Sequence, residues 1–165
     1  MVHSDVIDLA IVSVHPDDLP RGVVGVVIDT DHLVLAGPVG HRFENQDRTD
    51  IHELDGAELI SFREGSSLRH AADSVLASNG VVVSVVVESN EMSVLLGLIS
   101  CGLGLGIIPE AFAAQSALPL WSHPLDPPIT PPLSLIWRDG RRRSPAAEAF
   151  LRHMLASGNL TKAMG

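Results

Sequence analysis

The sequence has few of the residues that bind nucleic acids or form disulfides. It has no tyrosine, aromatic residues make up 4% of the chain, and 11 Lys and Arg stand against 20 Asp and Glu, for a net charge of −9. Binding to phosphate backbones depends on clustered Lys and Arg, so the composition argues against nucleic-acid binding by this chain itself. Cys101 is the only cysteine, which excludes an intrachain disulfide and fits a reducing compartment.

The sequence also lacks long apolar runs. None approaches the roughly 18 residues of a membrane span, and the first residues, MVHSDVIDLAIVSVHPDD, lack the basic start of a signal peptide. We therefore expect a cytoplasmic protein that has no membrane partner. Hydrophobic residues still make up 45% of the 165 positions, enough to form a sizeable core.

The apolar residues that are present form short, β-branched runs. Such runs predict strands, several of them buried on both faces. The predicted strands cover residues 6–14, 22–29, 32–39, 57–62, 81–89, 105–110 and 133–138. The proline-rich segment 126–132 is expected to be a stiff crossing strand or linker.

Helical patterns separate several of these runs. An apolar stripe predicts a helix over 66–79, with Ser66 or Ser67 as N-cap and Asn79-Gly80 at its end. A second predicted helix, 90–101, is apolar almost all round, so its terminal residue Cys101 is expected to be buried. Two further assignments concern helix ends: Ser89 is predicted to cap the second helix, and the last helix is predicted to run from its cap Ser144 to Gly158.

Strand and helix therefore alternate between residues 57 and 110, which predicts a parallel or mixed sheet. Ligands of such sheets bind beyond the carboxyl ends of the strands, where helices begin. There, Ser66, Ser67 and Arg63 could bind a carboxylate beside the free N–H groups of the helix, and Gly65 would let the backbone approach it. Alternatively, a serine is only the N-cap and Arg63 is solvated. Ser89 and Asn90 repeat the pattern at the next strand end.

Several motifs fail as catalytic or cofactor sites. The segment GLGLG, residues 102–106, follows a helix and precedes a strand, the reverse of a dinucleotide-binding order, and is predicted to form a helix C-cap and a close approach to a neighbouring element. The eight histidines show no metal-ligand spacing, and no G-x-S-x-G elbow occurs. We predict no enzyme activity, no metal and no cofactor.

Several segments, in this order along the chain, resemble the effector-binding domain of LysR-type transcriptional regulators. They are IDLAIVSV, LVLAGPVGHRF, LISFREGSSLR, VVVSVVVESNEMSVLLGLISCGLGLGIIPE and LSLIWRDGRRRSPAAEAFLRHM. The resemblance covers residues 5 to about 155. It implies an α/β fold of the two-lobed periplasmic-binding-protein type II kind, in which two strands cross between Rossmann-like lobes.

The resemblance also implies the domain limits. One lobe is expected to comprise residues 1–30 and 124–160 and the other residues 31–123, with crossings near 29–32 and 122–125 and a tail over 161–165. Family members begin with a helix-turn-helix, a linker helix and the first strand and helix of the effector domain. These have no counterpart before VIDLAIV, so the first lobe is expected to be incomplete.

The family's effector contacts map onto positions of this chain. On one side of the cleft they select Phe62, Arg63, Ser66, Ser67 and Leu68, with Ser89 and Asn90 beside them. Across the cleft they select Ser13, Val14 and His15.

The resemblance predicts a small-molecule sensing domain of a transcription regulator. Its effector is expected to be a small organic anion, and it is expected to act as a homodimer or higher oligomer. DNA would be contacted only through a helix-turn-helix domain that this chain does not contain. The alternative is a stand-alone solute-binding protein of the same fold.

Overall fold

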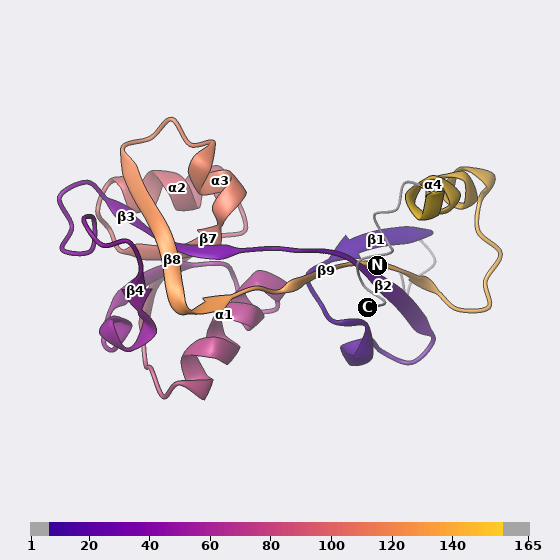
Figure 1. The fold of residues 1–165 in the computed structure, drawn as a ribbon, viewed down its shortest axis with the longest axis horizontal. Helices are drawn as coiled ribbons and strands as arrows, with labels where there is room; N and C mark the ends of the chain where they lie inside the picture. The colour runs from indigo at the N-terminus through magenta and orange to yellow at the C-terminus, as the bar shows by residue number, and fades with distance from the viewer. Residues whose placement is uncertain (1–6, 157–165) are drawn as a thin grey trace. The chain divides into compact units, whose positions relative to one another are not determined.

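The computed structural model describes residues 7–156, which divide into two compact units (Figure 1). The chain passes from the first unit to the second between Asp31 and His32, and returns between Thr130 and Pro131. The return therefore lies later than the expected crossing at 122–125. Residues 120–124 instead pair antiparallel with the strand Leu33–Pro38, which keeps this part of the chain in the second unit.

Over the described residues, the first unit contains a three-stranded antiparallel sheet and one α-helix. The strands β1 (Leu9–Val12), β9 (Pro132–Arg138) and β2 (Val23–Thr30) lie in that order. Val23 and Ile136 are its buried apolar centre. The helix α4 (Pro145–Ala156) buries Ala147 and Leu151, and the Ala147 amide donates to the Ser144 hydroxyl, which confirms Ser144 as its cap. The predicted end of this helix at Gly158 lies outside the described residues.

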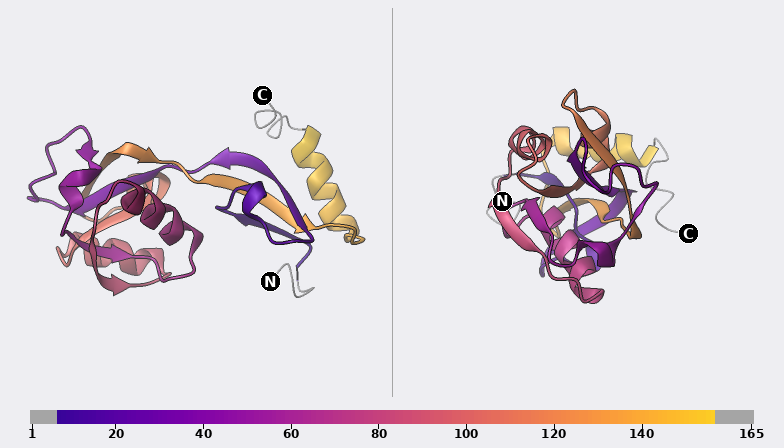
Figure 2. Two further views of the ribbon diagram at one scale, coloured as in Figure 1. Left: turned by 90° about the horizontal axis from the view of Figure 1, so that it is seen from below. Right: turned by 90° about the vertical axis from the view of Figure 1, so that its left-hand side faces the viewer.

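The second unit is a six-stranded mixed sheet with helices on both faces (Figures 1 and 2). The strand order is β4-β8-β3-β7-β5-β6, in which β5 pairs in parallel with both β6 and β7. The strands are β3 (Leu33–Pro38), β4 (Thr49–Asp50), β5 (Glu58–Ser61), β6 (Ser84–Glu88), β7 (Leu105–Pro109) and β8 (Leu120–Ile129). The helices are α1 (Ser67–Ser78), α2 (Met92–Ser100) and α3 (Glu110–Ala114).

Alternate side chains of the central strands supply two separate cores, because successive residues of a strand point to opposite faces. On one face, Leu33, Leu35 and Leu59 pack with Ala72 and Leu76 of α1. On the other, the cluster of Val34, Ala36, Ile60 and Ile108 packs with Leu95 and Ile99 of α2 and Ala113 of α3. This two-sided burial explains why β3 and β7 are apolar throughout, as the sequence predicted.

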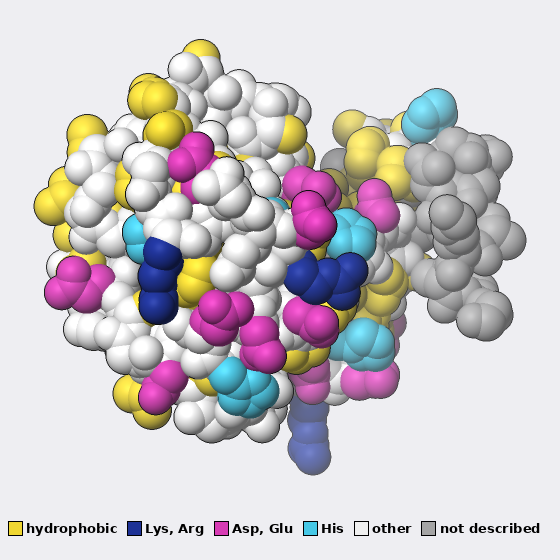
Figure 3. Space-filling model, turned by 60° about the vertical axis from the view of Figure 1, so that its left-hand side comes forward, with side chains coloured by type: hydrophobic (Ala, Val, Ile, Leu, Met, Phe, Trp, Pro, Cys, Tyr) yellow, Lys and Arg dark blue, Asp and Glu magenta, His cyan; other side chains and the backbone are white. Residues whose placement is uncertain are grey.

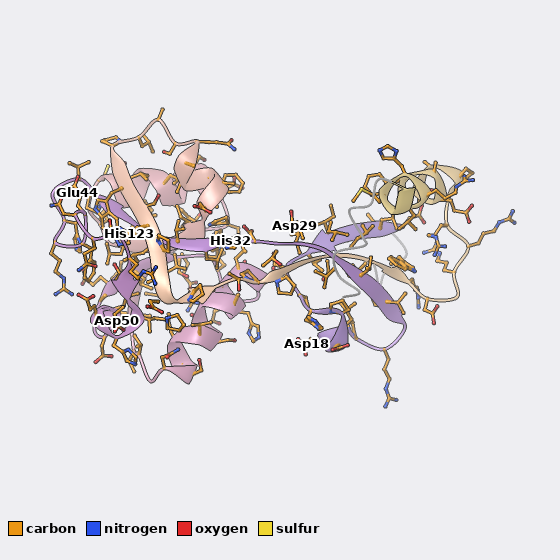
Figure 4. The ribbon with its side chains drawn as sticks, viewed as in Figure 1. Asp18, Asp29, His32, Glu44, Asp50 and His123 are labelled. Carbon is orange, nitrogen blue, oxygen red and sulfur yellow. The ribbon has the colours of Figure 1, made fainter. Side chains whose placement is uncertain are left out.

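One buried polar pair joins β4 to β8. Thr49 is fully buried and its hydroxyl lies 2.6 Å from Nε2 of His123, which is labelled in Figure 4. The His123 ring stacks on that of Trp121. The Thr49 hydroxyl donates to Oε1 of Gln46, so it accepts from His123 and places the imidazole proton on Nε2. Burial lowers the pKa of His123, which keeps the ring neutral at pH 7.

Several predictions from the sequence are wrong in detail. Cys101 is exposed, because α2 ends before it and the turn at Gly102 carries it to the surface. The N-cap of α2 is Glu91 instead of Ser89, because the Ser89 hydroxyl accepts the Glu91 amide in a turn that delays the helix. The structure also contains β4 and α3, which the sequence patterns did not predict, and the proline-rich 126–132 segment begins inside β8.

The prediction for GLGLG is confirmed. Gly102 has φ +79° directly after α2, and β7 begins at Leu105. A Cβ on Gly104 would lie 3.0 Å from the carbonyl oxygen of Glu58, tighter than an ordinary contact, so glycine favours this close approach of β7 to β5.

We predict opposite effects for two glycine substitutions. A Cβ at Gly37 would meet the indole of Trp121 and lie 2.8 Å from Leu105 Cδ2, so Gly37→Ala is expected to lower the free energy of unfolding by about 1–3 kcal/mol. Gly97 in α2 has no atom within 4 Å of its Cβ position, so Gly97→Ala is expected to raise it by about 0.5–1 kcal/mol. Urea unfolding of both variants measures the change in the free energy of unfolding. Changes of the same sign and size in the two variants would contradict the packing described.

Candidate functional site

The candidate site lies at the carboxyl edge of the parallel strands in the second unit. The chain leaves β5 at Ser61 and enters α1 at Ser67, and it leaves β6 at Glu88 and enters α2 at Met92. Because β5 and β6 are parallel neighbours, these two connections lie side by side. We refer to residues 61–67 and 88–91 as the paired loops.

Backbone and side-chain hydrogen bonds join the paired loops. The Ser89 amide donates to the Ser61 carbonyl at 3.1 Å, and the Arg63 amide donates to the Asn90 side-chain oxygen at 3.2 Å. Asn90 is thus oriented by its contact with the other loop. The structure brings together the two segments that the sequence predicted as neighbouring sites.

The start of α1 has side-chain hydroxyls that make no hydrogen bond to any other described residue. Ser66 is the N-cap residue in extended conformation, yet its side chain makes no capping hydrogen bond. Gly65, at φ +84°, and the Ser66 amide, which donates to the Arg63 carbonyl, form the tight turn that leads into the helix. The serine hydroxyls and first-turn N–H groups of this helix can therefore bind an anion, which the helix dipole also favours.

Two of the predicted contact residues have buried side chains. Phe62 is 6% exposed and packs in the cluster of Leu95 and Ile99, while its carbonyl oxygen accepts from Arg69. Leu68 is partly buried and packs against the cores on both faces of the sheet. Leu68 thus holds the start of α1 on the sheet and Phe62 anchors the preceding loop in the core below α2, so the side chains left open are those of Arg63, Ser66 and Ser67.

Arg69 is a residue of this region that the sequence patterns did not single out. Its side chain is 12% exposed and reaches the carboxylates of Asp73 and Glu88, each at 2.7 Å, and the Phe62 carbonyl oxygen at 3.0 Å. Burial alone would lower the pKa of Arg69, but the hydrogen bonds to Glu88 and Asp73 outweigh it and raise that pKa. The i, i+4 spacing of Arg69 and Asp73 was the available sequence signal.

The remaining predicted residues belong to the first unit. Ser13, Val14 and His15 follow β1 directly, and Nδ1 of His15 accepts the Asp17 amide at the start of a short 3-10 helix. Ser13 and Val14 are half-buried and His15 is exposed. The structure places these three residues together at the end of one strand.

Within residues 7–156, no three His, Cys, Asp or Glu side chains are arranged to hold a metal ion. No helix in the same range combines the length and the apolar character that crossing a bilayer requires.

Comparison with known families and proteins gives concordant results. The family described as the LysR substrate binding domain matches residues 1–159. The transcriptional dual regulator GltC of Bacillus subtilis is 24% identical over 151 residues, which cover 90% of this chain and 50% of that protein. The regulatory protein NocR of Agrobacterium tumefaciens is 32% identical over 120 residues, which cover 72% of this chain and 39% of that protein. The chain thus spans half or less of the length of these two relatives.

Solved structures share the fold. The regulatory domain of CcmR from Synechocystis PCC6803, in complex with 2-PG, has a TM-score of 0.83 and 20% identity, over 94% of this chain and 76% of that chain. The effector-binding domain of QuiR, in complex with shikimate, has a TM-score of 0.83 and 22% identity, over 95% of this chain and 74% of that chain.

We predict that Arg69 and Arg63 differ in their effect on stability. Arg69→Met keeps the apolar stem but leaves Asp73 and Glu88 without their cation, and is expected to lower the free energy of unfolding by about 1–2 kcal/mol, since both carboxylates are partly solvated. Arg63 is exposed, so Arg63→Met should change the free energy of unfolding by less than about 0.5 kcal/mol. Chemical denaturation of both variants tests this. A larger loss for Arg63→Met would show that the paired loops are held differently.

Proposed function

The chain belongs to the LysR substrate-binding domain family, and on that premise we propose that its paired loops bind a small organic anion as the effector of a transcription regulator. The observation that carries the proposal is the start of α1, where Ser66 leaves the first turn uncapped and Arg63 is exposed beside it. An uncapped helix start next to a guanidinium favours a carboxylate, which accepts hydrogen bonds from both.

Two features support a prearranged site. The contact of the Arg63 amide with Asn90 joins the loops before any ligand binds, and Arg69 holds α1 against β6. A site whose parts are already in place loses less conformational entropy on binding. The similar structures of CcmR and QuiR contain 2-PG and shikimate, which supports binding of a small molecule here.

In the proposed mechanism, the effector shifts a conformational equilibrium by binding one state more tightly than another. Ser13, Val14 and His15 are proposed to contribute from the first unit, and Ser89 and Asn90 from the second paired loop. The regulator would contact DNA through a separate helix-turn-helix domain and act in the cytoplasm. The net charge of −9 supports this division, and Figure 3 shows acidic side chains spread over the displayed face with few Lys or Arg among them.

The alternative function is that of a stand-alone solute-binding protein. The regulatory relatives favour the sensing domain, since GltC and NocR are regulators. Enzyme activity is not proposed, because the family consists of transcription regulators and the paired loops contain no nucleophile paired with a base.

We predict that a carboxylate effector stabilises this chain. A ligand present at a hundredfold excess over its Kd should raise the free energy of unfolding by about 2.7 kcal/mol. Thermal-shift screening of small aromatic and aliphatic carboxylates is expected to identify it, and Arg63→Ala and Ser66→Ala should reduce the shift. Ser74→Ala, on an exposed part of the same helix, is the matched control. A ligand whose shift is the same in all three variants and the parent would refute this site.

A second prediction concerns self-association. Among the described residues, β1 pairs on one side only, with β9, and its Ile11 side chain is 53% exposed. An open strand edge with an exposed apolar side chain favours pairing with another chain. Sedimentation at micromolar concentration is expected to show a species heavier than 17.5 kDa, as a homodimer or higher oligomer. Ile11→Lys should weaken the association, whereas Val39→Lys, at a site in the second unit that is 62% exposed, should not. A parent chain that sediments as a monomer would contradict this prediction.

A further inference from the structure

A pocket of about 250 Å³ opens at the end of the second unit's sheet opposite the paired loops. Glu58 lines it and is the first residue of β5, whereas the paired loops begin at Ser61, the last residue of the same strand. At about 3.3 Å per residue, these two positions are about 10 Å apart along the strand. The pocket is therefore separate from the proposed effector site, and nothing in the following argument depends on that site.

Arg42 provides a fixed cation in this pocket. Its guanidinium carbon lies 4.4 Å from the centre of the Phe43 ring, and its Nη2 donates to the Glu53 carbonyl oxygen at 3.1 Å. The two contacts hold the guanidinium in place and use one of its nitrogens. No other hydrogen bond or ion pair of Arg42 occurs within the described residues, so the remaining N–H groups are available to a ligand.

His41 supplies a neutral donor beside Arg42. Its Nδ1 accepts the Phe43 amide at 3.3 Å, so the proton of the neutral ring is on Nε2. Burial lowers the pKa of His41, and the charge of Arg42 lowers it further, which keeps the ring uncharged at neutral pH. The ring also lies 5.1 Å from that of Phe43 and 5.9 Å from that of Trp121, measured between centroids, which limits its rotation.

Glu58 supplies a negative charge in the same pocket. Its side chain is exposed and makes no hydrogen bond or ion pair within the described part of the chain. Arg42 and Glu58 thus line one pocket without being paired to each other. Phe43, Leu105 and Pro38 provide apolar surface around these groups. The volume is below the roughly 300–1,000 Å³ of sites for drug-sized ligands, so the ligand must be smaller.

We propose that this pocket is a second ligand site, which binds a small zwitterion of the α-amino acid class. The carboxylate accepts from Arg42 and from Nε2 of His41, the ammonium donates to Glu58, and a short apolar side chain lies on Phe43 and Leu105. An anion alone would leave Glu58 unpaired beside it, and a cation alone would be repelled by Arg42. A zwitterion pairs with both Arg42 and Glu58, so we propose it in preference to a simple anion or a simple cation.

Binding of the common L-amino acids to the full chain, each added alone and followed by amide chemical-shift titration, tests the proposal. At least one small apolar amino acid is expected to shift the amide signals of residues 39–43 and 102–105. Arg42→Met and Glu58→Gln should each weaken binding about tenfold or more, the loss expected for one charge-assisted hydrogen bond. Arg63→Ala, in the other site, should leave the affinity unchanged.

Two further ligands separate the zwitterion from simpler occupants. Propionate lacks the ammonium and ethylamine lacks the carboxylate, so each is expected to bind about tenfold or more weakly than L-alanine. Propionate or inorganic phosphate binding as tightly as the amino acid, with no effect of Glu58→Gln, would overturn the proposal in favour of an anion site. The proposal would also be overturned if none of the amino acids changed the chemical shifts of these residues. Glu58→Gln removes no hydrogen bond or ion pair between residues 7 and 156, so loss of folding is not expected to explain its result.

Discussion

The parallel pairing of β5 with both β6 and β7 is the constraint on which the second unit depends. Parallel neighbours must be joined by crossovers, and here those crossovers contain α1 and α2, which cover opposite faces of the sheet. The same pairing brings the carboxyl ends of β5 and β6 to one edge, where the paired loops meet. It also leaves the opposite end of β5 beside the start of β7, where Glu58 and Leu105 line the pocket.

The glycine at position 104 favours close contact between β5 and β7, because a Cβ there would lie only 3.0 Å from the Glu58 carbonyl oxygen. The glycine at 37 has a similar role at β3, where Trp121 occupies the space that a Cβ would need. The indole N–H donates to the Pro38 carbonyl at 2.8 Å, which fixes the ring. Packing at these two positions thus sets the spacing of the sheet that supports both the proposed sites.

The residues near α1 fall into two groups by their hydrogen bonding: those bonded within the chain and those whose side chains are open to a ligand. Arg69 uses Nε and Nη1 on Asp73, Glu88 and the Phe62 carbonyl, so it stabilises the arrangement of the loops and the helix. The side chains of Arg63, Ser66 and Ser67 have no such partners among the described residues. The two arginines, six residues apart, would be difficult to distinguish by residue type alone, because the partners of Arg69 include a carboxylate on another strand.

The sequence by itself determined the order of strands and helices around 57–110, the caps at Asn79-Gly80 and Ser144, and the close approach at GLGLG, because these depend on local periodicity and on backbone freedom. It also sufficed to recognise the family. Only the tertiary structure decided that Phe62 and Leu68 face the cores, that Cys101 is exposed and that β8 continues to Ile129. It also brought His41 and Arg42 to the same pocket as Glu58. These outcomes depend on which distant segments pack together, and neither residue type nor spacing along the chain specifies that.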